Sequence, residues 1–531
     1  MINKTQIAGI AYLGFVSGVT ACANPSEETN TKPPNILFIM SDDHTSQMWG
    51  EVYGGVLKPY VQTKNIERLA KEGAVLQNCF CSNSLSTPSR GTILTGQYSH
   101  VNGIKTLGGK LDPNYNHIVK EMGKAGYQSA IIGKWHLNAK PSGFDYYNIL
   151  HGQGEYHNPI FMSEENWRDG KDSGETYEGY CTDITTDMTI DWISKRDTDR
   201  PFIAMCHFKA THEPFDYPSR LENLYKDVTF PLPKGFNDSI PEKSGRPFFG
   251  QQIDELTQRY IFATNNPDKR RDYLNYPGLP FESEGLTREE LRFKTYQKMI
   301  HDYVRCAAAS DENIGRLLDY LDKAGLAENT IVIYTSDQGY FLGEHGFYDK
   351  RLIYEESLRM PLVIRYPKEI PAGSRNYDLI ENVDFSALFA DYSGIEYPAE
   401  MQGRSFRQNL KGNTPDNWRN CTYYRYWEHM PTIPGHFGIR TDRYKLTFYY
   451  GNGIEEEKEI KKGITPQKRI YWELLDLKAD PTESRNLYTD SSYATVISEL
   501  KEQLKAKRAE IQDTDADNPA ILQIIAKHWD N

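Results

Sequence analysis

The sequence lacks the features that mark several classes of protein. Its seven cysteines form no CxxC pair and no metal-finger spacing, which excludes a zinc finger, although one or two disulfides are possible in an oxidising compartment. Acidic residues are in excess, because 61 Lys and Arg stand against 73 Asp and Glu, a formal net charge of −12. Such a chain lacks the broad basic surface that non-specific nucleic-acid binding requires. Beyond the N-terminal region, no run approaches the ~18 consecutive apolar residues that would span a bilayer.

Residues 1–22 are typical of an export signal. Lys4 precedes an apolar stretch from Ile7 to Val19, which is short for a membrane span. The stretch closes with Val-Thr-Ala-Cys, which resembles a bacterial lipobox, so Cys22 is predicted to carry a lipid; an ordinary signal peptide with a chance cysteine is the alternative. Residues 23–34 are polar and are predicted to form a tether. We therefore expect an exported protein, anchored through its N-terminal lipid to the membrane of the bacterial cell envelope, in the periplasm or at the outer-membrane surface.

Short apolar segments alternate with helical patterns over residues 35–416, the predicted catalytic domain. The segments that favour strands are 35–40, 128–134, 201–208, 330–337 and 361–365, and those that favour helices are 65–72, 117–126, 184–195 and 293–324. This alternation predicts an α/β fold with a large, mostly parallel sheet sandwiched by helices. Residues 235–285, rich in Pro, Asn and charge, are predicted to form a surface insertion near the substrate entrance. From residue 417 short strand-like stretches precede a final helix, so 417–531 are predicted to form a smaller C-terminal α+β subdomain.

The most specific motif in the chain is Ser86-Thr87-Pro88-Ser89-Arg90, followed by Gly-Thr-Ile-Leu-Thr-Gly. It places a hydroxyl just before a helix, whose N-terminus favours an anion, and Arg90 adds a positive charge. A helix cap alone would account for Ser-x-Pro, but the whole string resembles the signature of the sulfatase family, within the alkaline-phosphatase-like superfamily. In that family a Cys or Ser at the position of Ser86 is converted to formylglycine (3-oxoalanine), and the bacterial serine form is matured by a radical enzyme. The resemblance extends from Asn35 to about Leu487.

The resemblance also implies a metal site. Asp42 and Asp43 follow the first predicted strand, and Asp337 and Gln338 lie at the end of the strand at 330–337. These four residues match the protein ligands of one divalent cation in the family, completed by the side chain of residue 86. Carboxylate and amide oxygens suit Ca²⁺. Gln338 departs from the Asn that is more frequent at this place in the family, which changes the geometry of the site but not the type of donor atom.

The catalytic groups are likewise implied by the resemblance. In the block Gly-Lys-Trp-His, Lys134 would hold the hydroxyls of the formylglycine hydrate and His136 would take a proton when the sulfated intermediate collapses. His212, in Thr-His-Glu-Pro, matches the histidine beside the leaving-group oxygen, and Lys350 matches the lysine that binds the sulfate. Together with Ca²⁺, the cations Arg90, Lys134 and Lys350 would neutralise the ester so that a nucleophile can approach.

The substrate is predicted from a weaker resemblance. Residues 141–159 are similar to a subgroup of bacterial exo-sulfatases that act on 6-O-sulfated N-acetylglucosamine in host glycans such as heparan sulfate or mucin. Gln153 and Asn158 in this segment are candidate substrate contacts, and His436 of the second predicted unit is a third. A 2-O-sulfate on uronic acid and an N-sulfate on glucosamine are alternative targets.

Two alternatives lie outside the sulfatases. A phosphatase or phosphodiesterase of the same superfamily would use Ser86 directly, and it would bind two metals through additional Asp and His ligands that the sequence does not reveal. A non-catalytic glycan-binding lipoprotein should have lost Arg90, Lys134 or a metal-binding acid, and all of these are present.

Overall fold

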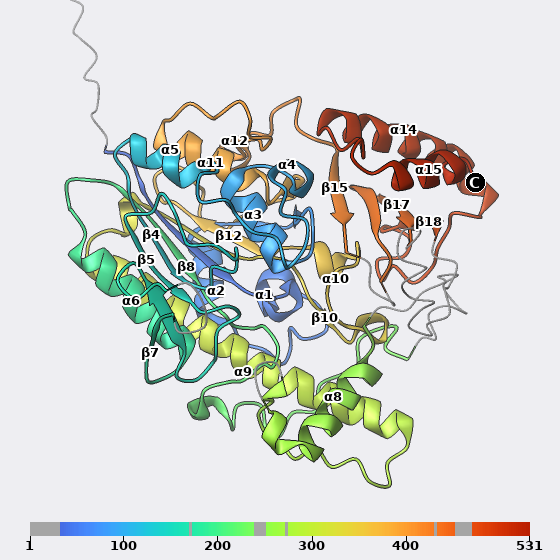
Figure 1. Ribbon diagram of the computed structural model, residues 1–531, viewed down its shortest axis with the longest axis horizontal. Coiled ribbons are helices and arrows are strands. Elements are labelled where there is room, and N and C mark those ends of the chain that lie inside the picture. The colour runs from blue at the N-terminus through green and yellow to red at the C-terminus, as the bar shows by residue number, and fades with distance from the viewer. Residues whose placement is uncertain (1–31, 169–172, 238–250, 271–273, 429–432, 452–469) are drawn as a thin grey trace, which may run out of the picture. The chain divides into compact units, whose positions relative to one another are not determined.

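A large mixed sheet forms the centre of the protein (Figure 1). The computed structural model describes residues 32–168, 173–237, 251–270, 274–428, 433–451 and 470–531. The strands of the sheet follow the order β13-β2-β12-β9-β1-β8-β4-β5-β6-β7. Their bounds are β1 Asn35–Ser41, β2 Ala74–Leu76, β4 Gln128–Gly133, β5 Tyr146–Leu150, β6 Ile160–Ser163, β7 Glu175–Thr176, β8 Phe202–His207, β9 Thr330–Ser336, β12 Leu362–Arg365 and β13 Ser374–Asn376.

The middle of the sheet is parallel and its flanks are partly antiparallel. β1 lies between β8 and β9 and is parallel to both, and β4 and β5 continue the parallel arrangement. The predicted mostly parallel sheet is therefore confirmed. The predicted strand at 361–365 corresponds to β12, which is antiparallel to β9. No crossover returns the chain to the start of β9, so it enters β12 from the carboxyl end of the sheet.

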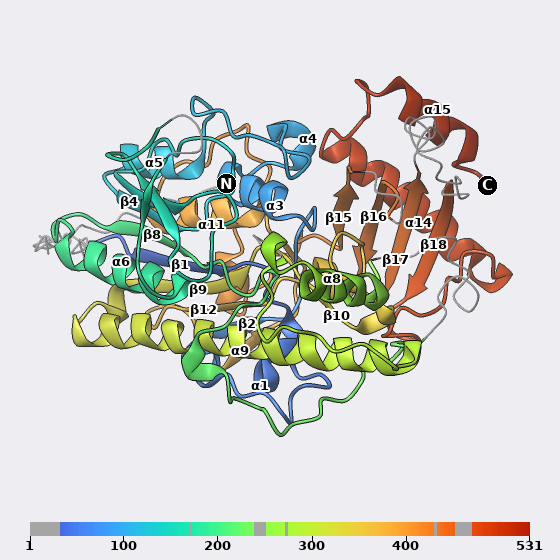
Figure 2. The same cartoon turned by 60° about the horizontal axis from the view of Figure 1, so that its bottom comes forward.

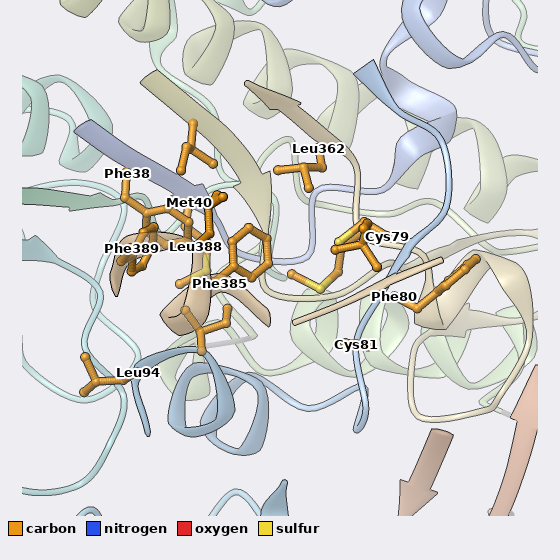
Figure 3. Close-up of a cluster of buried hydrophobic side chains, with 14 of the residues drawn as sticks. Phe38, Met40, Cys79, Phe80, Cys81, Leu94, Leu362, Phe385, Leu388 and Phe389 are labelled. Atoms are coloured by element: carbon orange, nitrogen blue, oxygen red, sulfur yellow. The ribbon is translucent and has the colours of Figure 1, made fainter. Parts of the chain in front are cut away.

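Helices cover both faces of the sheet (Figures 1 and 2). The main ones are α2 Lys64–Glu72, α3 Ser86–Thr95, α5 Ile118–Lys124, α6 Cys181–Lys195, α8 Ile253–Asn265, α9 Arg288–Lys323 and α11 Asp384–Ser393. Successive residues of β1 point to opposite faces. Phe38 and Met40 pack with Phe385 in the core that α3 and α11 cover (Figure 3). Leu37 and Ile39 belong to the core on the other face, which includes residues of α2 and α9. β1 is thus buried on both sides, as its continuous apolar sequence predicts.

Short elements connect the main ones. These are α1 Gly50–Tyr53, α4 Ser99–Asn102, α10 Glu355–Leu358, α12 Arg407–Leu410, β3 Cys79–Phe80, β10 Phe341–Leu342, β11 Tyr348–Asp349 and β14 Ile380–Glu381. Within the described residues, all of the cysteines are buried and none forms a disulfide. The same residues contain no helix with both the length and the apolar character that crossing a membrane requires.

The C-terminal part of the chain builds a second, antiparallel sheet (Figure 2). Its strands, in spatial order, are β15 Cys421–Tyr426, β16 His436–Thr441, β17 Tyr444–Tyr450 and β18 Ile470–Asp476. Two helices follow, α14 Ala494–Glu510 and α15 Pro519–His528, and their apolar side chains complete the core of this sheet. Residues 33–531 together form one compact unit, so the small sheet belongs to the same body as the large one.

A buried ionic network ties β15 to the chain beyond α14. The guanidinium of Arg425 lies 2.6 Å from Asp513 Oδ1 and 2.6 Å from Asp515 Oδ1, and its carbon lies 3.5 Å from the centre of the Trp427 ring. Arg508 contributes a second cation, 2.5 Å from Asp515 Oδ2. Because these carboxylates are almost completely buried, each depends on its arginine partners for compensation.

Candidate active site

The acidic residues that follow β1 and β9 meet where these adjacent parallel strands end. The backbone N–H of Asp43 donates to Asp337 Oδ1 at 3.1 Å, and Ser86 Oγ, at the start of α3, donates to Asp42 Oδ1 at 3.1 Å. Gln338 Nε2 contacts Asp43 Oδ1 and lies 3.5 Å from Ser86 Oγ. The structure therefore brings all five sequence-predicted metal ligands into one cluster, in which no residue is more than 1% exposed.

Three buried cations lie against this cluster. Arg90, one helical turn after Ser86, lies 3.3 Å from Asp42 Oδ2 and 3.1 Å from Asp337 Oδ2. Lys134, directly after β4, contacts Asp42, and Lys350 lies 2.6 Å from Asp43 Oδ2. These pairings explain how so many charges share one interior site, since buried charges are tolerated only when compensated.

The two neighbouring aspartates differ in protonation behaviour. Burial alone would raise the pKa of Asp42, but the positive charges of Lys134, Arg90 and Lys350 outweigh burial and hold that pKa well below its usual value. Burial raises the pKa of Asp43 to about 7; Lys350 opposes the rise, whereas Asp42 and the other nearby carboxylates add to it. The lysine and arginine side chains near Asp43 therefore do not fully compensate its negative charge.

The cluster fits a divalent cation. Gln338 Oε1 is buried and has no hydrogen-bond partner among the residues that the structure describes, so this amide oxygen is available as a ligand. Ligand atoms of Asp42, Asp43 and His212 all lie within 4.8 Å of one another. Of the available donors, the carboxylate and amide oxygens match Ca²⁺ better than the imidazole nitrogen of His212 does.

Two histidines flank the cluster. His212 Nδ1 donates to the carbonyl of Glu213 at 2.7 Å, and its Nε2 lies 3.9 Å from Asp43 Oδ2. His136 Nε2 lies 3.2 Å from Gln153 Nε2, and Gln153 Oε1 lies 2.6 Å from Lys134 Nζ. Burial, reinforced by the charge of Lys134, holds the pKa of both histidines well below the usual value. Both rings are therefore neutral at pH 7.

A cavity of about 660 Å³ opens onto this cluster. Its wall includes the predicted residues Asp43, Ser86, Gln153, His212 and Lys350. The rest of the wall comes mainly from loops, with contributions from 151–157, 209–216 and 349–351. Gln251, Arg259 and Asn275, from the predicted surface insertion, also line it. Arg90, Lys134 and His136 are not part of the wall; Arg90 and Lys134 are buried, whereas His136 is half-buried beside Gln153.

Several wall residues were not predicted from the sequence. Glu213, next to His212, lies 3.0 Å from Arg259 and also contacts Tyr276. It therefore connects the insertion at 235–285 to the loop that carries His212. Asp349 and Arg351 flank Lys350 and contact each other. In the sequence, the acid in Thr-His-Glu-Pro and the charged residues beside Lys350 were the only signs of these wall residues. The partner of Glu213 is far away in the sequence, so the pair cannot be identified without the fold.

Two predicted substrate contacts do not reach the cavity. Asn158 Oδ1 accepts a hydrogen bond from the backbone N–H of Gly179 at 2.9 Å, and Asn158 is not a wall residue. His436 is completely buried on β16, where its ring packs against Tyr424 and Tyr449. Asn158 thus caps a loop and His436 packs in the core, and contact of either residue with sugar stays a prediction. Cys22, the predicted lipid attachment site, lies outside the described residues.

Comparisons with known proteins cover almost the whole chain. Residues 34–395 match the profile of the Sulfatase family, and residues 343–510 match that of the C-terminal part of N-sulphoglucosamine sulphohydrolase. An N-acetylglucosamine-6-O-sulfatase of Bacteroides thetaiotaomicron is 39% identical over 551 residues, which span 97% of this chain and 92% of the relative. A solved structure described as a complex with its substrate D-glucosamine-2-N,6-O-disulfate is 37% identical, with a TM-score of 0.82 over 92% of this chain and 100% of that one. A phosphonate monoester hydrolase from Silicibacter pomeroyi shares the fold, with 20% identity and a TM-score of 0.67 over 91% of this chain and 96% of that one.

Proposed function

Because this chain belongs to the sulfatase family, we propose that it removes the 6-O-sulfate from N-acetylglucosamine residues of sulfated glycans such as heparan sulfate or mucin. The observation that carries the proposal is the buried cluster of Ser86, three carboxylates and their cations beneath an open cavity. The choice of sugar is supported by the relative from Bacteroides thetaiotaomicron, named for this reaction, and by the similar structure that binds a glucosamine disulfate.

The proposed cofactors are one Ca²⁺ and a formylglycine made from Ser86 by a radical-type maturing enzyme. Asp42, Asp43, Asp337 and Gln338, with residue 86, would hold the cation. Bound there, Ca²⁺ would supply positive charge against the ester oxygens, and the hydrated aldehyde would supply the attacking hydroxyl.

The remaining residues divide the work of charge and proton handling. Lys350 lies on the cavity wall, where its ammonium can meet the sulfate, while Arg90 orients Asp42 and Asp337 from behind. His212 has its Nδ1 proton committed to the carbonyl of Glu213, so Nε2 is the nitrogen left for proton transfer. A bound anionic ester favours the protonated form of His212, which with Lys350 can then protonate the departing alcohol. His136 would take the proton of the second hydroxyl of the formylglycine hydrate when the sulfate is released.

The proposal is tested by incubating protein co-produced with a radical maturing enzyme with a panel of sulfated sugars and measuring released sulfate. The panel contains 6-O-sulfated N-acetylglucosamine, N-sulfated glucosamine and a disaccharide with a 2-O-sulfated uronic acid, and matched Ser86→Ala protein is the control. Release from the 6-O ester, abolished in the control, is the expected result. Release from the uronic acid ester alone would overturn the choice of sugar, and release from none would overturn the reaction. Mass spectrometry of the peptide around residue 86 reads the oxidation of Ser86 separately.

Export and lipid anchoring through Cys22 are part of the same proposal. An enzyme that trims large glycans must meet them outside the cytoplasm, and the signal-like residues 1–22 support this location. Metabolic labelling with an alkyne fatty acid should mark the intact protein and not the Cys22→Ser variant. Equal labelling of both proteins would contradict the anchor.

A further inference from the structure

One side chain on the cavity wall joins two catalytic candidates that are not themselves on the wall. Gln153 lies in the loop after β5, and its amide is placed between Lys134 and His136. Lys134 Nζ donates to Gln153 Oε1 at 2.6 Å, and Gln153 Nε2 lies 3.2 Å from His136 Nε2. Lys134 also contacts Asp42, so its ammonium is held from two directions.

The chemistry of these groups fixes the direction of each hydrogen bond. A lysine ammonium can only donate, so the amide oxygen of Gln153 must face Lys134 and the amide nitrogen must face His136. That nitrogen can only donate as well, so His136 Nε2 must accept. The proton of the neutral imidazole is then on Nδ1, and the lone pair is on Nε2.

Among the described residues, no other hydrogen bond competes for this choice of tautomer. His136 Nδ1 is buried and has no hydrogen-bond partner within the described part of the chain. A ring with one partnered and one unpartnered nitrogen takes the tautomer that the partner demands, because the alternative would set two N–H groups against each other. Gln153 is therefore the residue that decides where the proton of His136 resides.

A second lysine holds the backbone of Gln153 in place. Lys209 is 3% exposed, and its Nζ donates to the carbonyl of Gln153 at 3.1 Å. Its ammonium also lies 4.9 Å from the centre of the Tyr156 ring, in the same loop. Lys350 and Arg259 on this wall each have a carboxylate partner, whereas among the described residues Lys209 has no carboxylate within 4 Å. The hydrogen bond and the ring contact of Lys209 are thus both with the loop that carries Gln153.

We propose that Gln153 is a positioning residue that holds His136 in the tautomer with its lone pair on Nε2 and fixes the ammonium of Lys134, and that Lys209 secures the loop. The expected effect on kcat rests on the proposed function, in which His136 accepts a proton. The tautomer proposed here makes Nε2 the accepting atom. Because Gln153 also lies on the cavity wall, its role as a substrate contact stays a prediction beside this one.

The test compares Gln153→Met and Gln153→Glu with the unchanged, matured protein. Methionine keeps the length of the side chain and removes both hydrogen bonds. Glutamate still accepts from Lys134 but requires a donor at His136 Nε2, so it moves the proton to that nitrogen. Long-range ¹H–¹⁵N spectra of histidine-labelled protein without substrate read the tautomer, and the His136 signals are assigned from their loss in His136→Gln. We expect Nδ1–H in the unchanged protein, a mixture in Gln153→Met and Nε2–H in Gln153→Glu.

Kinetics separate positioning from substrate contact. We expect kcat of Gln153→Met to fall by about tenfold to a hundredfold with little change in KM. A rise in KM at unchanged kcat, or a tautomer unaffected by either substitution, would overturn the proposal. If Gln153→Met is unstable, Lys209→Met must show the same change in a milder form, and an unchanged spectrum there would likewise count against it.

A control variant and a measurement on the resting protein distinguish failure of this proposal from failure of the proposed function. Gln408→Met makes the same substitution at an exposed residue that is off the cavity wall, so kcat and the tautomer should stay unchanged. The tautomer is measured in the resting protein and does not depend on the identity of the substrate. A wrong sugar therefore leaves the spectra as predicted, whereas a wrong role for Gln153 alters them whatever the sugar is.

Discussion

Gly133 packs so closely against His207 that a Cβ on Gly133 would lie 2.0 Å from the carbonyl oxygen of His207. The backbone N–H of Lys134 donates to the same oxygen at 2.8 Å, and Gly133 has a φ of +95°, a conformation that other residues rarely adopt. The end of β4 is thereby fixed against β8, immediately before the two catalytic candidates Lys134 and His136.

Replacing Gly133 with alanine should disturb both the backbone and the site. The positive φ costs about 1–3 kcal/mol, and the clash adds to this cost and displaces Lys134. We expect a lower midpoint in urea unfolding and a loss of sulfate release of about a hundredfold or more. Gly126→Ala is the matched control, because Gly126 has a φ of +91° but a Cβ added there would meet no atom within 4 Å. Equal losses of stability and activity in the two variants would show that the strained backbone, and not the clash with His207, is responsible.

Binding of the proposed calcium ion should stabilise the protein. Asp42, Asp43 and Asp337 are buried together, and without a cation their mutual repulsion is only partly offset. Calcium at a hundredfold excess over its Kd should raise stability by about 2.7 kcal/mol, seen as a higher melting temperature than in a chelator. Asp337→Asn should abolish most of this difference, whereas Asp227→Asn at an exposed position should retain it. Identical melting of the unchanged protein with calcium and with chelator would contradict the assignment.

Arg425→Met should destabilise the C-terminal part of the protein by about 3–5 kcal/mol, because Asp513 and Asp515 would each lose a cation that lies 2.6 Å away in a buried place. Urea unfolding measures the loss. Adding Asp513→Asn and Asp515→Asn to the same variant should restore part of the stability by removing the unpaired charges. Lys124→Met, which breaks an exposed pair with Glu121, should change stability by less than about 1 kcal/mol. A comparable effect of both lysine and arginine substitutions would refute the role of the network.

The same network should make the protein sensitive to acid. Burial would raise the pKa of Asp513, but Arg425 and Arg508 outweigh burial and lower it to about 2, from 3.8. A carboxyl whose pKa is lower in the folded state stabilises that state above its unfolded pKa. This contribution, about 2 kcal/mol, is lost as the pH falls from about 4 to about 2. Unfolding measured across that range should show a shallower slope for Asp513→Asn, and an unaltered slope would rule the residue out as its source.

The ligand-bearing part of the site was predictable because of how parallel sheets are built. A strand covered on both faces must be a continuous apolar run, which marks β1 and β9 in the sequence, and polar residues that follow such strands share one edge of the sheet. The rest depends on contacts that only folding creates. His436 lies in a strand whose neighbours supply tyrosines, and no local pattern shows that both of its sides are covered. The pairing of Glu213 with Arg259 joins two loops with no shared pattern.

The different origins of the charged cluster and of the rest of the cavity wall have an evolutionary consequence. The cluster is anchored to the ends of central strands and to the first turn of α3, where almost any change disturbs the core, whereas the wall is drawn largely from loops and from the insertion around α8. Loops tolerate exchange and elongation far better than buried strands do. Descendants of such an enzyme can therefore acquire specificity for new sugars through changes in the loops of the cavity wall, while the charged cluster that cleaves the ester is inherited unchanged.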